Sequence, residues 1–118
     1  MDKRTAYCKI IMENIAYDAL CHDYGADSIN EILEIMLDTV CSRKKEIYVN
    51  GEAMPINVVK SRLLKLDFTH IQYVVGCLER NTTKVRNIRQ YLLTTLYNAP
   101  ATIKHYYAAE VQHDFYGT

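Results

Sequence analysis

Apolar and polar residues recur along most of this chain with the period of an α-helix. The clearest case begins at Ser28, where apolar residues return at steps of three and four while acidic residues occupy the other side. Ser28 and Glu31 have the spacing of a capping box, so a helix is predicted from Ser28 to about Cys41. Its inward residues are Ile29, Ile32, Leu33, Met36, Leu37 and Val40, and its acidic face carries Glu31, Glu34 and Asp38.

Similar but weaker patterns predict helices elsewhere in the chain. One covers about residues 1–24 and stops at Gly25. A second such helix is expected at residues 57–66. A third should begin after a cap at Asp67 or Thr69 and end at about Arg80, and a fourth should begin after a cap at Thr82 or Thr83. Pro100 should end that last helix, because the residue before a proline disfavours helical geometry. A final helix is then expected at about residues 102–115.

Residues 46–56 have a different character, because β-forming residues there flank Asn50-Gly51. This pair suits the positive φ angles of a type I′ turn, which predicts a short β-hairpin. A two-stranded ribbon is marginal alone, so it should lie against helices or a partner. With 118 residues, the chain is expected to form a single helical domain over residues 1–118. The fold class is mostly α, a compact bundle of about five to six helices with one hairpin.

The net charge is zero, yet acids and bases are separated along the sequence. From Ile10 to Ser42 there are seven acids and no Lys or Arg. From Arg43 to Lys104 there are eleven bases and only four acids. The chain is therefore a charge dipole in sequence.

The basic stretch is the strongest candidate for a binding surface. Its cations are Arg80, Lys84, Arg86, Arg89 and Lys104. Residues 81–109 contain no acidic residue, and the next one is Glu110. Arg86 and Arg89 are three residues apart, so a shared helix face is expected. Such a face attracts the phosphates of nucleic acid. It also fits a plain solvated face, or the complement of the acidic helices in a neighbouring chain or within this one.

Signs of catalysis or cofactor binding are missing from the sequence. It has no Gly-rich phosphate loop, no Gly-x-Ser-x-Gly and no His-Glu-x-x-His, and its four histidines are far apart. The four cysteines form no Cys-x-x-Cys pair, so free buried thiols are expected rather than a metal site or disulfides. No segment is long and apolar enough to span a membrane, and no signal peptide is recognisable. The sequence indicates a cytoplasmic, non-enzymatic domain with no cofactor and no metal.

Three segments carry a family resemblance. They are Glu13-Asn14-Ile15-x-Tyr17-Asp18-x-Leu20, Val58-Val59-Lys60-Ser61-Arg62-Leu63-Leu64-Lys65-Leu66, and the block from Asn81 to Pro100. Together they resemble the C-terminal domain of replication initiator A (RepA) proteins of plasmids and conjugative elements of Gram-positive bacteria. Those domains in turn resemble the helical domain of DnaD-type primosomal proteins.

The resemblance implies a role in starting plasmid-type DNA replication. It implies contact with host replication proteins of the primosome or helicase-loading type, with DNA, or with both. The competing hypothesis is a protein-interaction or self-association module without DNA contact, in which the acidic helices of one copy meet the basic face of another. A homo-oligomer is compatible with either hypothesis.

Overall fold

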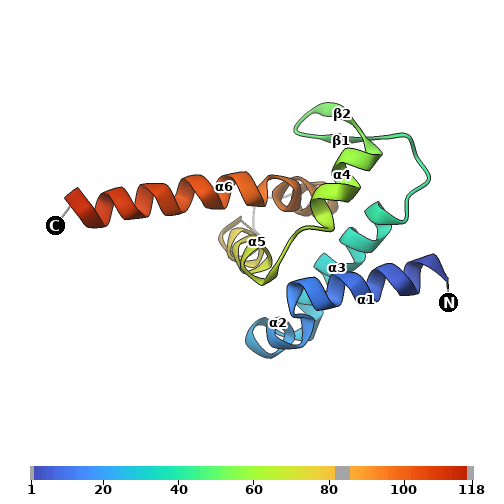
Figure 1. Cartoon of the computed structure of the whole chain (residues 1–118), viewed down its shortest axis with the longest axis horizontal. Coiled ribbons are helices and arrows are strands. Elements are labelled where there is room, and N and C mark those ends of the chain that lie inside the picture. Colours follow the sequence, from blue (N-terminus) through green and yellow to red (C-terminus); the bar gives the residue numbers. More distant parts are fainter. Residues whose placement is uncertain (1, 82–85, 117–118) are drawn as a thin grey trace.

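The computed structural model describes residues 2–81 and 86–116, and side chains within residues 2–81 and 86–104. This part of the chain forms six α-helices and one two-stranded antiparallel sheet, which confirms the predicted fold class (Figure 1). The elements are α1 (Lys3–Ile15), α2 (Tyr17–Tyr24), α3 (Ala26–Val40), β1 (Glu46–Val49), β2 (Glu52–Pro55), α4 (Ile56–Leu63), α5 (Phe68–Asn81) and α6 (Ile88–Tyr116).

The first predicted helix is divided in two at Ala16, which the sequence pattern did not indicate. Ala16 adopts the left-handed conformation, with φ 54° and ψ 59°, and its N–H bonds to the carbonyls of Glu13 and Met12. This closes α1 and lets α2 leave in a new direction. The predicted stop at Gly25 is confirmed, since its φ of 91° favours glycine and its N–H donates to the Cys21 carbonyl at 2.9 Å.

Helix α3 lies at the centre of the molecule, and eight of its fifteen residues are buried. The predicted apolar stripe and the predicted end are both confirmed. The predicted start at Ser28 is wrong, because Gly25 serves as the N-cap residue and α3 already begins at Ala26. Ser28 therefore falls within the first turn of α3 and no side chain caps the helix.

The hairpin forms where the sequence predicted it. Asn50 and Gly51 have φ values of 57° and 77°, the two positive angles that a type I′ turn requires. The hairpin is fastened to α6 in two places. Gln90 donates to the Tyr48 carbonyl at 2.9 Å, and the side-chain amides of Asn50 and Asn98 bond reciprocally at 3.0 and 2.9 Å. The ribbon therefore lies against a helix, as its small size demands.

Helix α5 begins with a reciprocal cap between Asp67 and His70. The Asp67 carboxylate accepts from the His70 N–H at 3.2 Å, and His70 Nδ1 accepts from the Asp67 N–H at 3.0 Å. Asp67 is therefore the cap, one of the two predicted residues. Because Nδ1 accepts, the proton of the neutral ring resides on Nε2. The contact of 3.1 Å between Nδ1 and the Asp67 carboxylate is then no charge pair while the ring stays neutral.

Two predictions for the C-terminal region are wrong. Helix α6 begins at Ile88, after the non-helical residues Arg86 and Asn87, and Asn87 caps it by accepting from the Gln90 N–H at 3.1 Å. The predicted caps Thr82 and Thr83 lie outside the described residues. Helix α6 also continues through Pro100 to Tyr116 as one helix of 29 residues.

Packing explains why Pro100 does not end α6. A proline cannot donate to the carbonyl four residues earlier, and its ring disturbs that turn of helix. In the same turn, Arg62 Nη1 of α4 donates to the Tyr97 carbonyl at 3.2 Å. Buried α6 residues lie on both sides of the proline, from Leu92 to Ile103. Burial of this face and the bond from Arg62 offset the helix-breaking effect.

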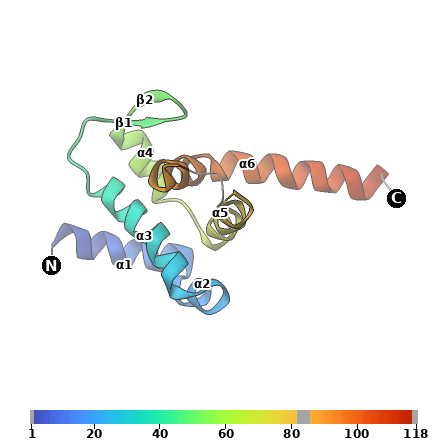
Figure 2. The ribbon, with the colours of Figure 1, turned by 180° about the vertical axis from the view of Figure 1, so that it is seen from behind.

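The buried apolar side chains form one cluster, drawn from every helix and from Val49 of β1. Helices α1, α2 and α3 lie together on one side, and the hairpin, α4 and α6 lie on the other, with α3 reaching between them (Figures 1 and 2). At the corner between α5 and α6, Tyr91 Oη donates to the Cys77 carbonyl at 3.2 Å. The last turns of α6 project away from the rest of the chain in both views.

Candidate interaction surfaces

Two residues of the predicted acidic face of α3 form ion pairs with a cation of the same chain. Arg4 of α1 lies 2.7 Å from Glu34 and 3.1 Å from Asp38. All three side chains are about half exposed, so these are surface ion pairs, which solvent and salt screen. Glu31, the third predicted residue, is exposed and pairs with no cation among the described residues.

Arg89 joins the two predicted surfaces. Its Nη2 lies 2.5 Å from Asp38 Oδ2, so one residue of the basic stretch binds one residue of the acidic face. Burial raises the pKa of Asp38, but the hydrogen bonds from Arg89 and Arg4 outweigh burial, and the pKa falls below its ordinary value of 3.8. The same contact with Asp38 is the main cause that raises the pKa of Arg4. The sequence left open whether the basic residues face solvent, a neighbouring chain or the acidic helices of the same chain. For Arg89 the third alternative holds, because it pairs with Asp38 of α3.

The other predicted cations are not gathered on one helix face. Arg86 is exposed but precedes α6, so the prediction that Arg86 and Arg89 share a helix face is wrong. Arg80 is exposed at the end of α5 and lies back along that helix, with its Nη2 3.5 Å from Cys77 Sγ. Lys84 lies outside the described residues.

Lys104 is remote from Arg89, although both belong to α6. It is exposed on α6, fifteen residues beyond Arg89, which corresponds to about 22 Å at a rise of 1.5 Å per residue. A ligand that contacts both residues must therefore be extended. The predicted basic stretch is thus a set of separate positions rather than one compact patch.

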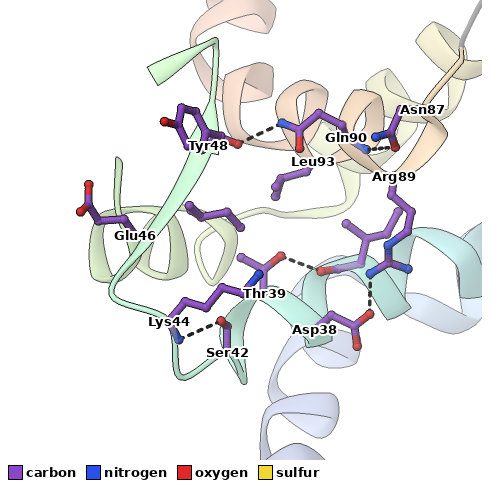
Figure 3. A pocket seen from close by; sticks show the side chains of 12 residues that line it. Asp38, Thr39, Ser42, Lys44, Glu46, Tyr48, Asn87, Arg89, Gln90 and Leu93 are labelled. Atoms are coloured by element: carbon purple, nitrogen blue, oxygen red, sulfur yellow. Dashed lines mark hydrogen bonds and ion pairs between the residues drawn. The ribbon is translucent and has the colours of Figure 1, made fainter. Parts of the chain in front are cut away.

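The Asp38–Arg89 pair borders a cleft of about 590 Å³ between the end of α3, the strand β1 and the start of α6 (Figure 3). Residues of both charges line it, with Asp38 and Arg89 on the side of α3 and α6, Lys44 just before β1 and Glu46 at the start of β1 (Figure 3). Gln90 lies at one wall, where it donates to the Tyr48 carbonyl. The residues around the cleft come from three elements, so no sequence spacing could have grouped them.

A second hollow, a groove of about 680 Å³, lies along α4 and is bordered by residues of α5 and α6. Its lining is Asn57, Val58, Ser61 and Arg62 of α4, Lys65 just beyond the end of α4, His70 of α5 and Pro100 of α6. All of its titratable lining residues are basic. Sequence reasoning missed this groove, although the α4 residues share one helix face and that pattern is visible in the sequence.

Separation of charge in the sequence becomes separation in space. Ten Lys and Arg residues between Arg43 and Lys104 are described, and Arg89 alone lies within ion-pair distance of a described carboxylate. These residues belong to the hairpin side, α4, α5 and α6, whereas the seven acids belong to α1, α2 and α3. The acidic helices lie on the opposite side from the hairpin and α4 (Figure 1).

The four cysteines are free thiols, but only Cys77 is buried as predicted, and Cys8, Cys21 and Cys41 are half-buried. Within the described residues, no group of three or more His, Cys, Asp or Glu side chains is arranged to hold a metal ion. None of the described helices combines the length and the hydropathy needed to cross a bilayer.

The fold and these surfaces define a small helical domain with a hairpin and a strong separation of charge. The chain belongs to a family described as a family of unknown function (DUF6017), whose family model matches residues 2–118. No curated protein and no solved structure matches the chain. The family description states no activity, so the resemblance to replication initiators stays a prediction.

Proposed function

We propose that this chain is a non-enzymatic binding domain of a plasmid-type DNA replication initiator, acting in the cytoplasm through contact with DNA, host replication proteins or both. One observation carries the proposal. The basic half of the molecule keeps nine described Lys and Arg residues without a described carboxylate partner, although an acidic half is part of the same chain. Resemblance to the C-terminal domain of replication initiator A proteins supplies the biological setting.

Unpaired cations on one side of a protein create a positive potential that reaches several ångströms into solvent. Such a potential draws polyanions, and each phosphate contact releases counterions from nucleic acid. Arg80 and Arg86 flank the connection between α5 and α6, and both are exposed. Arg89 is less suited to phosphate contact, because it would first have to leave Asp38. The proposed phosphate contacts are therefore Arg80 and Arg86.

The proposal is tested by fluorescence anisotropy of labelled single- and double-stranded DNA at about 50 and 200 mM salt, a range over which phosphate-driven binding falls sharply. The variant Arg80→Glu/Arg86→Glu should lose this binding. A matched control is Lys3→Glu/Lys9→Glu, which changes net charge equally on the acidic half, where both lysines are exposed. An affinity for DNA that does not change with salt concentration, or that both variants lower equally, would contradict DNA contact through this surface.

A second candidate function is self-association or protein interaction without DNA, favoured by the exposure of Glu31 on α3. Here the acidic half of one copy meets the basic half of another, and charge complementarity steers docking. Glu31→Lys and Arg86→Glu should each lower the association constant measured by analytical ultracentrifugation. Addition of DNA should leave association unchanged under this alternative.

A further inference from the structure

The groove on α4 has a chemical character that the predicted basic stretch lacks. Its basic members are Arg62, Lys65 and His70, and no carboxylate lines it. Between them the wall is apolar, formed by Val58, which is 45% exposed, and by Pro100. Cationic tips around an apolar surface are suited to a ligand that carries both negative charge and hydrocarbon.

Arg62 is held in place by two contacts with one residue. Its guanidinium carbon lies 4.2 Å from the centroid of the Tyr97 ring, and its Nη1 donates to the Tyr97 carbonyl at 3.2 Å. The remaining N–H groups of the guanidinium have no other acceptor among the described residues. A fixed guanidinium with unused donors loses little conformational entropy when it binds a carboxylate, and it binds that group with two parallel hydrogen bonds.

Lys65 and His70 add further hydrogen-bond donors at the rim of the groove. Lys65 is exposed just beyond the end of α4. His70 is fixed by its cap with Asp67, and its Nε2 keeps the ring proton, so the ring is a hydrogen-bond donor at the groove. The side chains at the groove therefore provide donors of three kinds around an apolar patch.

The end of a helix normally repels anions, because its last carbonyls are exposed. At the end of α4, three of the last four carbonyls accept hydrogen bonds. Those of Lys60, Arg62 and Leu63 accept from the backbone N–H groups of residues 64–66, and that of Leu64 accepts from Asn14 at 2.9 Å. The negative end of the helix is therefore blunted at the groove.

We infer that this groove binds an acidic peptide segment of a partner protein, with its carboxylates on Arg62 and Lys65 and an apolar side chain against Val58 and Pro100. Charge complementarity selects an acidic partner. The apolar wall selects a peptide over a nucleic-acid backbone, because a chain of phosphates gains nothing from hydrocarbon and is not complemented by it.

The inference rests on the proposed function, since it names the kind of partner protein that such a domain binds. Its site is separate from Arg80 and Arg86, so the two proposals fail separately. Loss of DNA binding in the Arg80→Glu/Arg86→Glu variant tests the first surface and says nothing about the groove.

The test uses a fluorescein-labelled peptide that alternates pairs of glutamate with pairs of leucine, and a control peptide with glutamine in place of glutamate. Titration into the 15N-labelled chain should shift amide resonances of residues 57–65 and of His70. The glutamine peptide should bind at least about tenfold more weakly, the equivalent of one decade in the dissociation constant. Absence of binding, shifts confined to other residues, or equal binding of both peptides would overturn the inference.

Two substitutions separate charge from the apolar contact. Lys65→Glu and Val58→Asp both alter exposed positions of the groove, so the fold should persist. Each should raise the dissociation constant for the glutamate peptide by at least about tenfold. Lys45→Glu is the matched control, because it reverses an exposed charge outside the groove and should leave the affinity unchanged. Oligothymidine is then added as competitor, and displacement of the peptide by it would assign the groove to nucleic acid instead.

Discussion

Arg89 and Asp38 are 51 residues apart in the chain and lie 2.5 Å apart in the structure. Each belongs to a surface that the sequence predicted as separate, one basic and one acidic. Their contact links the start of α6 to α3, and Arg4 extends the link to α1. The basic and acidic segments of the sequence therefore meet in an ion pair at Arg89, whereas the other described cations between Arg43 and Lys104 have no described carboxylate partner.

Asp38→Asn should lower stability in a pH-dependent way. A carboxylate with a lower pKa in the folded chain than in the unfolded chain stabilises the fold above the unfolded pKa, near 3.8. That contribution is lost as pH falls through the folded pKa. Because the Asp38 side chain is 41% exposed, screening limits the expected loss at pH 7 to about 0.5–1 kcal/mol.

Urea unfolding of both proteins from pH 7 to pH 3 measures this effect. The difference between wild type and Asp38→Asn should shrink below about pH 4, once the carboxylate of the wild type takes up a proton. Glu31→Gln is the control, since Glu31 has no described cation partner. An Asp38→Asn effect that is constant with pH would contradict the role given to the ion pair.

Arg62→Met should destabilise the chain although it keeps an unbranched apolar stem. The substitution removes the contact with the Tyr97 ring and leaves the Tyr97 carbonyl without its side-chain donor. The expected loss in free energy of unfolding is about 1–2 kcal/mol. Lys65→Met, on the exposed side of the same groove, should change stability by less than about 0.5 kcal/mol. Equal effects of the two substitutions in urea unfolding would argue against a supporting role for Arg62.

Ala16→Gly should stabilise the chain. Ala16 has a left-handed conformation, which costs a residue with a Cβ about 1 kcal/mol and glycine almost nothing. Ala6→Gly provides the opposite case, because Ala6 is exposed within α1 and glycine costs about 1 kcal/mol in a helix interior. Thermal unfolding should therefore show the melting temperature rising for the first variant and falling for the second.

Pro100→Ala should also raise stability, by about 1–3 kcal/mol, because it restores the missing N–H within α6. Pro55→Ala is the comparison, since Pro55 is exposed and lies at the N-cap of α4 rather than inside a helix. Its effect in urea unfolding should be within about 0.5 kcal/mol. A loss of stability in Pro100→Ala would show that contacts of the proline ring outweigh the helix defect.

Predictions from the sequence held where local chemistry decides the structure. Asn50-Gly51 specifies its turn because both residues accept positive φ. The apolar stripe of α3 is strong enough to mark the central helix, and Asp67 caps α5 as expected. In each case the determining residues lie within a few positions of one another.

Predictions failed where distant parts of the chain decide. Ala16 shows no preference for the left-handed conformation, so the break between α1 and α2 is imposed by packing. Pro100 is a helix breaker by local rules, yet Arg62 and the buried face of α6 maintain the helix. The cleft and the groove each combine residues from three elements, which periodicity along one segment cannot reveal.

The position of α6 in the chain also determines when this domain can fold during synthesis. Leu92, Leu93, Leu96, Tyr97 and Ala99 complete a buried cluster whose first member in the chain is Ile11. Until the ribosome has released this segment of α6, the apolar residues of α3 and α5 that pack against it remain exposed to solvent. A nascent chain that stops short of Ala99 therefore exposes hydrophobic surface that is prone to aggregation, and the domain completes its core only late in synthesis.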